Sequence, residues 1–467
     1  MLPSVTLTVP AKLHTQLRKH LFCGDGRESA AIVLCSRTPP PRRRLLAKHV
    51  LLVPNDACSL RSPDEITWPG DYLEQAIDIA EAEGLAILLM HSHPGDMLDF
   101  SLADDQSDRI VIPALFHAMG DIHGTAIMVP DGTIKARIYG QGQTLKCEPV
   151  DLVSVSGSNL TFWWNDERRS AAHPRPTAFT SEMTQELGRL SVAIIGVSGT
   201  GSPVAEQVAR LGFGKIILID PDKVEPRNLN RIINATTQDA AEGALKVEMF
   251  ANSIASHRGA NVATSIAESI LTRPAVLAAS QCDVIFCCTD TLEARYVADL
   301  LCSTFLIPVF DVGVVIPSRK VGDAIAVIGA FGRIDYVYPG GSTLQDRKVY
   351  APETLEAEYL RKSAPSELQE RVKAGYLPGT NEEAPAVITL NMYAAAKCLS
   401  EFINRAYSFG EPNRNFSRIM FNIGDREQDN YAEDSFPTTT SGLLATGAVE
   451  PLLGLPKLSL PRSERQR

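Results

Sequence analysis

The sequence predicts an α/β protein with two large folded regions joined by a linker. Its 467 residues suffice for about three domains at roughly 150 residues each, or for two large ones. Hydrophobic residues make up 44% and charged residues 21% of the chain, which is typical of globular proteins and argues against long disorder. The order of apolar and amphipathic runs changes near residue 180, and this change separates the two regions.

Charge, hydropathy and cysteine usage limit the partners and the compartment. The 55 Asp and Glu against 45 Lys and Arg give a net charge of -10, so we expect no nucleic-acid partner and no membrane partner. Apolar runs such as 84–90 and 191–197 are far shorter than the roughly 20 residues that cross a bilayer, and the first residues lack a signal-peptide pattern. Nine cysteines without a CxxC pair indicate reduced thiols. We therefore expect a cytoplasmic protein.

Residues 1–145 are predicted to form the first domain, an α/β or α+β unit. β-type runs mix there with helical patterns. The runs lie at 30–35, 45–53, 85–90, 125–129 and 134–139, and the helical patterns at 11–22, 72–83 and 102–119. The stretch that follows carries Ser, Asn and Pro without a sustained period, so we expect residues 146–180 to be a linker.

Residues 181–437 are predicted to form a Rossmann-like, doubly wound domain. The apolar strands SVAIIGV, KIILID, DVIFCCTD and IPVFDVGVV alternate with helical segments. Such alternation is typical of a parallel sheet that binds ligands at the carboxyl ends of its strands. Residues 380–407 resemble one further helix, whereas the tail at 438–467 has no clear periodicity and no readable role.

A candidate metal site follows the apolar run at 85–90. Alternate residues of a strand point to one side, so His91 and His93 can face one ion. Ser101 and Asp104 lie at the predicted start of the next helix. Two imidazoles and the Asp104 carboxylate make three protein ligands, and an open fourth position is typical of catalytic zinc. Taken alone, Ser101 and Asp104 also fit an ordinary helix capping box.

Hydrolysis at such a site needs a proton acceptor and an oxyanion donor. Glu28, ahead of the run at 30–35, is our candidate acceptor, although Glu65 and Glu74 also lie upstream. Ser101 is the candidate donor.

This segment resembles the JAMM (JAB/MPN) metalloproteases over roughly residues 1–140, because a glutamate is followed by H-S-H-P, seven residues and S-L-A-D. The family motif is H-x-H, seven residues, S-x-x-D, and the match is complete. The resemblance implies zinc bound by His91, His93 and Asp104. It also implies that Glu28 is the general base and that Ser101 steadies the tetrahedral intermediate.

A glycine-rich turn follows the strand SVAIIG in the second domain. Gly196, Gly199 and Gly201 lie between that strand and a helix, where backbone N–H groups can approach phosphates. Asp220, at the end of the next strand, is placed to bind ribose. These residues alone also fit a dinucleotide site.

Polar residues farther along favour a triphosphate over a nicotinamide. Asp222 closely follows the second strand, and Asn228, Arg231 and Lys246 add one amide and two cations near the glycine turn. Asp290 ends the strand DVIFCCTD, where a carboxylate can hold magnesium.

This series resembles the ThiF/MoeB family and the ubiquitin-activating enzymes over roughly residues 180–400, including 209–214 and Arg295. The resemblance implies a homodimer that uses ATP and Mg²⁺ to adenylate the C-terminal glycine of a ubiquitin-like protein. Its implied site residues are Asp220 for ribose, Asn228, Arg231 and Lys246 for the phosphates, and Asp290 for the metal. An arginine that reaches the partner subunit's ATP usually precedes the domain in this family. Arg175 is our candidate for it, with Arg168 and Arg169 close by.

The chain departs from that family at one glycine and at its cysteines. Ser198 replaces the second glycine of the turn, and the cysteine pairs for a structural zinc are absent, notably at 338–346. Region 335–390, where a thioester cysteine would be sought, contains none. Besides Cys282, this domain has four cysteines that fall in apolar patterns and are expected to be buried: Cys287, Cys288, Cys302 and Cys398. We therefore expect a thiol on another protein to attack the acyl-adenylate.

Two further features are interpreted as structural. Trp163 and Trp164 are expected to pack in a core. The arginine run 42–44 is expected to be a solvated loop, and contact with an acidic face of a partner is the alternative.

Both resemblances imply one kind of substrate, the flexible C-terminus of a ubiquitin-like protein. The first domain would trim or remove this protein, and the second would activate it, with a ubiquitin-conjugating-type enzyme as a further partner. Three alternatives stay open: activation of a sulfur-carrier protein for cofactor or cysteine synthesis, a peptidase joined to a non-catalytic nucleotide-binding scaffold, and a dinucleotide oxidoreductase.

Overall fold

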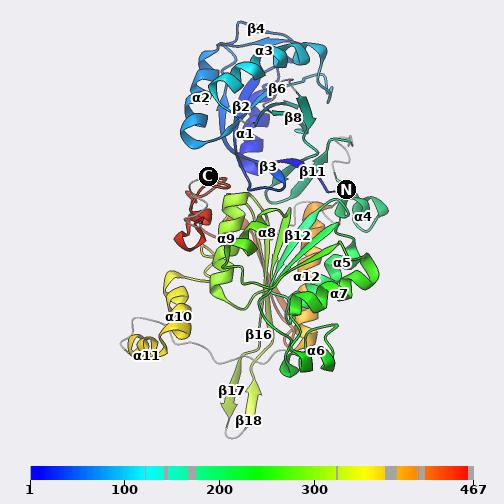
Figure 1. Ribbon diagram of the computed structural model, residues 1–467, viewed down its shortest axis with the longest axis vertical. Helices are drawn as coiled ribbons and strands as arrows, with labels where there is room; N and C mark the ends of the chain where they lie inside the picture. The colour runs from blue at the N-terminus through cyan, green and yellow to red at the C-terminus, as the bar shows by residue number, and fades with distance from the viewer. Residues whose placement is uncertain are drawn as a thin grey trace.

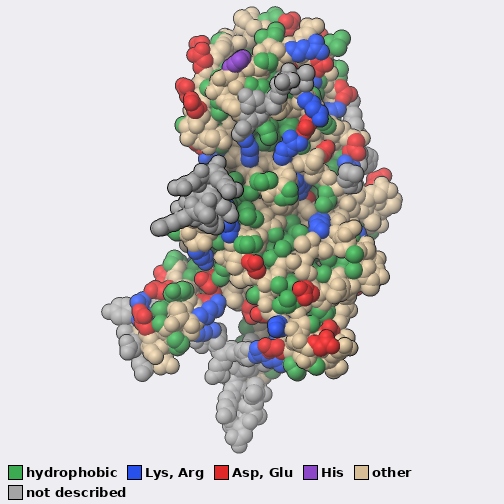
Figure 2. Space-filling view, in the orientation of Figure 1, with side chains coloured by type: hydrophobic (Ala, Val, Ile, Leu, Met, Phe, Trp, Pro, Cys, Tyr) green, Lys and Arg blue, Asp and Glu red, His purple; other side chains and the backbone are tan. Residues whose placement is uncertain are grey.

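The computed structural model describes residues 2–120, 122–140, 146–166, 175–321, 324–373, 387–407, 409 and 416–460. Two α/β domains follow each other along the long axis of the molecule, with the N-terminal one in blue at the top of Figure 1. Acidic and basic side chains are scattered over both domains on the face shown in Figure 2. Within the described ranges, no helix is both long and apolar enough to cross a membrane.

A nine-stranded sheet in the order β11-β10-β1-β3-β2-β6-β7-β8-β9 forms the N-terminal domain. Its strands are β1 (Val5–Pro10), β2 (Ala30–Arg37), β3 (Arg43–Leu52), β6 (Ala86–Ser92), β7 (Ile122–Met128), β8 (Ile134–Gly140), β9 (Lys146–Pro149), β10 (Leu152–Ser156) and β11 (Leu160–Trp164). Helix α1 (Ala11–Leu21) packs on one face, and α2 (Asp71–Glu83) and α3 (Leu102–Ala118) pack on the other. A short hairpin of β4 (Leu60–Arg61) and β5 (Ile66–Thr67) lies outside this sheet.

The stretch that we expected to be a linker begins as part of this sheet. Strands β9 to β11 lie within 146–164, and β10 pairs in parallel with β1. Trp164 is buried in the core of the second domain, where its Nε1 donates to Glu186 at 2.8 Å, and Trp163 packs on the first core. The linker prediction is therefore wrong for these residues, because strands of four or five residues are too short to show a sustained period. The packing role of both tryptophans is confirmed.

An eight-stranded sheet in the order β14-β13-β12-β15-β16-β19-β20-β21 forms the second domain. Its strands are β12 (Ser191–Ile195), β13 (Lys215–Ile219), β14 (Ala263–Ile266), β15 (Val284–Cys287), β16 (Val309–Val315), β19 (Phe331–Val337), β20 (Arg418–Asn422) and β21 (Glu427–Tyr431). The five strands from β14 to β16 are parallel, as a doubly wound fold requires. The pairs from β16 to β21 are antiparallel, and the sequence pattern did not predict them.

Helices cover both faces of the parallel strands. On one face lie α5 (Gly201–Leu211), α7 (Lys246–Arg258) and α12 (Ile388–Ala406), and on the other lie α8 (Arg273–Ser280) and α9 (Leu292–Phe305). Outside these layers are α4 (Ser181–Leu187), α6 (Thr237–Glu242), α10 (Pro352–Ser363), α11 (Pro365–Lys373) and the hairpin of β17 (Ser318–Val321) and β18 (Ala324–Val327). The tail packs against the face of α8 and α9 through Ala445, Leu452, Leu453 and Leu458.

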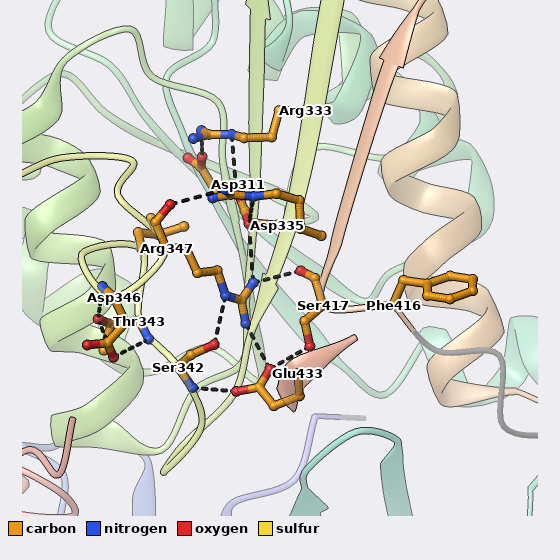
Figure 3. A network of polar contacts seen from close by, with 12 residues as sticks. Asp311, Arg333, Asp335, Ser342, Thr343, Asp346, Arg347, Phe416, Ser417 and Glu433 are labelled. Carbon is orange, nitrogen blue, oxygen red and sulfur yellow. Dashed lines mark hydrogen bonds and ion pairs between the residues drawn. The ribbon is translucent and has the colours of Figure 1, made fainter. Parts of the chain in front are cut away.

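A buried network of ion pairs fastens the antiparallel strands to the segment at 338–346. The fully buried Arg347 lies 3.3 Å from Asp335 and 3.1 Å from Glu433, and it donates to the carbonyl oxygen of Ser417 at 2.6 Å (Figure 3). Arg347 Nε also donates to the hydroxyl of Ser342 at 2.9 Å. Charged side chains therefore hold the segment in which the sequence lacks a cysteine pair.

Two arginines of the run that we interpreted as a solvated loop lie between the domains. Arg44 is 2% exposed and donates to the carbonyl oxygens of Ser280 at 2.7 Å and Phe305 at 3.3 Å, which end α8 and α9. Arg42 forms an ion pair with the buried Asp283 at 2.8 Å. A cation at helix C-termini interacts favourably with unpaired carbonyls and with the helix dipoles. The solvated-loop interpretation is wrong for these two residues because their acceptors come from the other domain.

The strands of both sheets run away from or toward the domain interface in defined directions. Strand β2 ends at the interface with Arg37, whose carbonyl oxygen accepts from Ala448 in the tail, and it begins at Ala30, which pairs with His91. Strand β12 begins at the interface with Ser191 and ends at the glycine turn. The carboxyl ends of β6 and β12 therefore lie on opposite sides of the interface.

Candidate metal centre and nucleotide site

Three predicted metal ligands converge at the carboxyl end of β6. The Nε2 atoms of His91 and His93 lie 3.0 Å apart. His91 Nε2 lies 3.1 Å from Asp104 Oδ1, and His93 Nε2 lies 3.6 Å from Asp104 Oδ2. Burial opposes ionisation of Asp104, but hydrogen bonds to both histidines outweigh it and lower the pKa of the carboxyl group. The arrangement joins two imidazole nitrogens and one carboxylate.

The distances fit a tetrahedral zinc ion. Ligand atoms about 2.1 Å from zinc lie about 3.4 Å from one another in a tetrahedron, close to the three separations observed. His93 Nδ1 contacts the carbonyl oxygen of Met97 at 2.7 Å. Because that oxygen only accepts, Nδ1 carries the proton and leaves the Nε2 lone pair for a metal. The donor set therefore suits zinc.

Ser101 and Asp104 form the capping box that was the alternative interpretation, and the Asp104 carboxylate still contacts the histidines. Ser101 Oγ accepts from the Asp104 N–H at 3.1 Å, and Asp104 Oδ2 accepts from the Ser101 N–H at 2.6 Å. Capping uses one lone pair of the Ser101 hydroxyl and leaves its O–H free to donate. The cap thus fixes the carboxylate that points toward His91 and His93.

Glu28 is the glutamate that the fold brings to this cluster. It precedes β2 and is 4% exposed, and one of its carboxylate oxygens lies within 4.8 Å of donor atoms of His91 and His93. Burial raises the pKa of the Glu28 carboxyl group to about 7, against the opposite effect of the two histidines. Glu65 and Glu74, the other two upstream candidates, are exposed. Glu28 therefore has the reach and the pKa of a group that exchanges protons near neutral pH.

The glycine turn lies where β12 leads into α5. Gly196 has φ +86°, a left-handed conformation that favours glycine. A Cβ on Gly201 would lie 1.8 Å from the carbonyl oxygen of Gly196, so no side chain fits there. The turn therefore exposes backbone N–H groups at the start of a helix, an arrangement that suits an anion.

Asp220 and Lys246 line the adjacent end of β13. Asp220 Oδ2 accepts from the Val197 N–H at 2.7 Å, which ties the strand to the glycine turn, and burial raises its pKa. Lys246 is 4% exposed, and its Nζ lies 2.8 Å from Asp222 and 3.9 Å from Asp220. The Lys246 ammonium group thus pairs with the carboxylates of Asp222 and Asp220.

The other predicted phosphate and metal residues lie at the rim of the same turn. Asn228 Oδ1 accepts from the Glu225 N–H at 3.1 Å. Arg231 lays its stem against Gly199, while its guanidinium donates to the carbonyl oxygen of Arg227 at 2.9 Å. Asp290 is exposed beside Thr289, whose Cα lies 3.2 Å from the position of a Cβ on Gly196.

Arg175 lies away from the glycine turn, whereas the buried Cys288 lies against it, with its Cβ 3.3 Å from the position of a Cβ on Gly201. Arg175 Nη1 donates to the carbonyl oxygen of Arg405 at 2.6 Å, near the end of α12 that is remote from the turn. Arg168 and Arg169 are outside the described residues. The four cysteines predicted to be buried, Cys287, Cys288, Cys302 and Cys398, are buried, and so is Cys282. Burial raises the pKa of all five thiols. These thiols are poor nucleophiles in this fold.

Sequence reasoning missed two groups that support the sites. Met97 supplies the carbonyl oxygen that sets the tautomer of His93, and a backbone acceptor leaves no pattern in the sequence. Asn391 of α12 contacts Thr200 in the glycine turn, a separation of 191 residues along the chain. Only the three-dimensional structure reveals such a pairing.

Two family models match the chain, one in each domain. The model of prokaryotic homologs of the JAB domain matches residues 10–134, and the model of the ThiF family matches residues 173–405. The matches agree with the two sheets described above and with both resemblances read from the motifs.

The curated relatives match about a quarter of this chain. Ubiquitin-like modifier-activating enzyme 5 of Caenorhabditis briggsae is 33% identical over 125 residues, which cover 24% of this chain and 28% of that protein. The Arabidopsis thaliana enzyme of the same name is 31% identical over 132 residues, covering 26% and 31%. This chain thus spans about a third of the length of these relatives.

Solved structures of E. coli MccB also align with this chain. The complex with ATP has a TM-score of 0.41 and 18% identity and covers 56% of this chain and 68% of MccB. The complex with N-formylated MccA has a TM-score of 0.43 and 19% identity, with coverage of 56% and 69%.

Proposed function

The chain belongs to two families at once, the prokaryotic homologs of the JAB domain and ThiF, and from this premise we propose a bifunctional enzyme that acts on one ubiquitin-like protein. The JAB domain is a zinc-dependent peptidase or isopeptidase that trims or removes this protein. The ThiF domain uses ATP and Mg²⁺ to adenylate its C-terminal glycine. The proposal is supported by the presence of two sites in one polypeptide. In the first, Glu28, His91, His93 and Asp104 lie close together as potential metal ligands. In the second, Asp220 is hydrogen-bonded to the glycine turn.

In the proposed peptidase domain, each side chain of the site has a separate role in amide hydrolysis. His91, His93 and Asp104 would hold zinc, which would lower the pKa of a water to about 7 and polarise the scissile carbonyl group. Glu28 accepts a proton from the attacking water and passes it to the leaving amine. The free Ser101 O–H donates to the oxyanion.

In the adenylating half, the glycine turn and its neighbours hold ATP. The turn's N–H groups, Arg231 and Lys246 would bind the phosphates, and Asp290 would hold Mg²⁺, which would supply positive charge for the reaction. The substrate carboxylate attacks the α-phosphorus, the bond to the β-phosphate oxygen breaks, and pyrophosphate leaves. Lys246 exchanges its contact with the exposed Asp222 for the phosphates. Because the five thiols of this domain are buried, an external thiol receives the acyl group.

The test uses the full chain and a ubiquitin-like protein with a C-terminal extension. Incubation with zinc, magnesium and ATP, followed by intact mass spectrometry, is expected to show loss of the extension. An ATP-dependent adduct, captured by an added thiol, should follow. Loss of the extension without any ATP-dependent change would contradict adenylation. Intact extension with ATP-dependent change would contradict the peptidase. A carrier that instead gains sulfur in place of oxygen would identify sulfur-carrier activation.

A further inference from the structure

Helix α12 brings a buried amide to the glycine turn from a distant part of the chain. Asn391 lies in the first turn of α12 and is only 2% exposed. Its Oδ1 accepts from the Thr200 hydroxyl at 3.4 Å. Its Nδ2 lies 2.6 Å from the position that a Cβ on Gly199 would take. The Asn391 amide therefore occupies the space beside Gly199 that a side chain at this position would fill.

The Nδ2 group has no acceptor among the described residues, although the residue is almost fully buried. The Nδ2 group is therefore available to donate to an acceptor that a ligand supplies. Arg231 flanks the same glycine, with its Cδ 3.1 Å from the same Cβ position. The start of α12 adds the positive end of a 19-residue helix. Each of these features favours an anion with oxygen acceptors.

We propose that Asn391 is a nucleotide-binding residue whose Nδ2 donates to a phosphate oxygen of ATP at the glycine turn. This inference rests on the proposed adenylating function and adds a contact from α12 to it. Thr200 holds the amide by its oxygen and thereby turns the N–H groups toward the phosphates. Helix α12 thus completes the site, with α5 on one side of the phosphates and the Asn391 amide on the other.

The experiment compares binding of ATP and adenosine by calorimetry with full-length variants. Replacing Asn391→Ala should weaken ATP binding by about 10-fold, and Asn391→Asp by about 100-fold or more because a carboxylate repels phosphate. Binding of adenosine, which lacks phosphates, should change by less than about 2-fold. Ser400→Asp, which adds the same charge at an exposed position of α12, is the matched control and should bind both ligands like the wild type.

The outcomes separate the inference from the function on which it rests. Wild-type affinity for ATP in Asn391→Asp would overturn the inference and leave adenylation standing. An equal loss for ATP and adenosine would also overturn it, since that pattern indicates a disturbed fold. Absence of ATP binding by the wild type would overturn the proposed function itself.

Discussion

The two candidate sites differ in how far they are assembled before a ligand arrives. At the metal centre, separate side chains already point at one spot, with three donor distances between 3.0 and 3.6 Å. At the nucleotide site, Lys246 pairs with Asp222 and Arg231 with a backbone carbonyl. A metal centre formed by two neighbouring elements is set by the fold alone. If the proposed function holds, ATP binding would replace these internal contacts, at the cost of breaking them.

The two sites also lie on opposite sides of the domain interface. The metal centre is separated from the interface by the eight residues of β2, and the glycine turn by the five residues of β12. At roughly 3.3 Å per residue, these lengths are about 26 and 16 Å. A substrate C-terminus bound at one site is therefore far from the other, and we expect trimming and activation to occur in separate encounters.

Loss of the proton acceptor should give the largest effect and affect one site alone. Replacing Glu28→Gln keeps the shape and the metal ligands, so the cleavage rate should fall by about 10²- to 10⁴-fold with zinc content unchanged. His91→Ala, by contrast, should lose the metal as well. Zinc content, cleavage rate and ATP-dependent pyrophosphate exchange, measured on the same samples, check this. Reduced exchange in Glu28→Gln would break the claim of independence.

The interface arginine should give the next largest effect, on stability. Arg44→Ala removes two charge-assisted hydrogen bonds at the ends of α8 and α9, and we expect a loss of about 3 kcal/mol in the free energy of unfolding. The neighbouring Arg43 is 44% exposed and pairs with Glu148, so Arg43→Ala should cost less than about 1 kcal/mol. Denaturant unfolding of both variants measures the difference. Equal losses would show that the interface does not depend on Arg44.

A smaller effect is expected at the phosphate site. Lys246→Ala should weaken ATP binding by about 10- to 100-fold, since a charge-assisted contact is lost. Cleavage should not change, because the metal centre lies in the other domain. Lys223→Ala, at a neighbouring exposed position, is the control. Isothermal calorimetry gives the affinities, and wild-type affinity in Lys246→Ala would remove this lysine from the site.

The smallest effect is expected where β11 meets the second domain. Trp164→Phe removes the hydrogen bond to Glu186, and we expect a loss of about 1–2 kcal/mol in the free energy of unfolding. The same variant should cleave and bind ATP normally. Thermal unfolding checks the first point. An unchanged free energy of unfolding would show that the hydrogen bond from β11 to the second domain does not stabilise the protein.

The sequence predicted the parts that depend on local patterns. The residues from His91 to Asp104 occupy one strand end and one helix start, so their spacing alone brings them together. The parallel strands were equally readable, because each is a short apolar run followed by a helix. These predictions needed no contact between distant segments.

The remaining features depend on contacts between distant segments. Strands β10 and β11 are too short to show a period, and Arg44 finds its acceptors more than 230 residues away. Strand β19 is separated from β20 and β21 by α10, α11 and α12, which hid its pairing with β20. Asn391 likewise meets the glycine turn only in the folded chain.

The most direct test of the two-site account is a crossed measurement on Glu28→Gln and Lys246→Ala. Each variant is mixed with the extended ubiquitin-like protein, zinc, magnesium and ATP, and both products are followed by intact mass spectrometry. The account predicts that Glu28→Gln activates an already trimmed substrate but does not trim, and that Lys246→Ala trims at the wild-type rate but activates poorly. Loss of both activities in either variant would contradict two separately working sites.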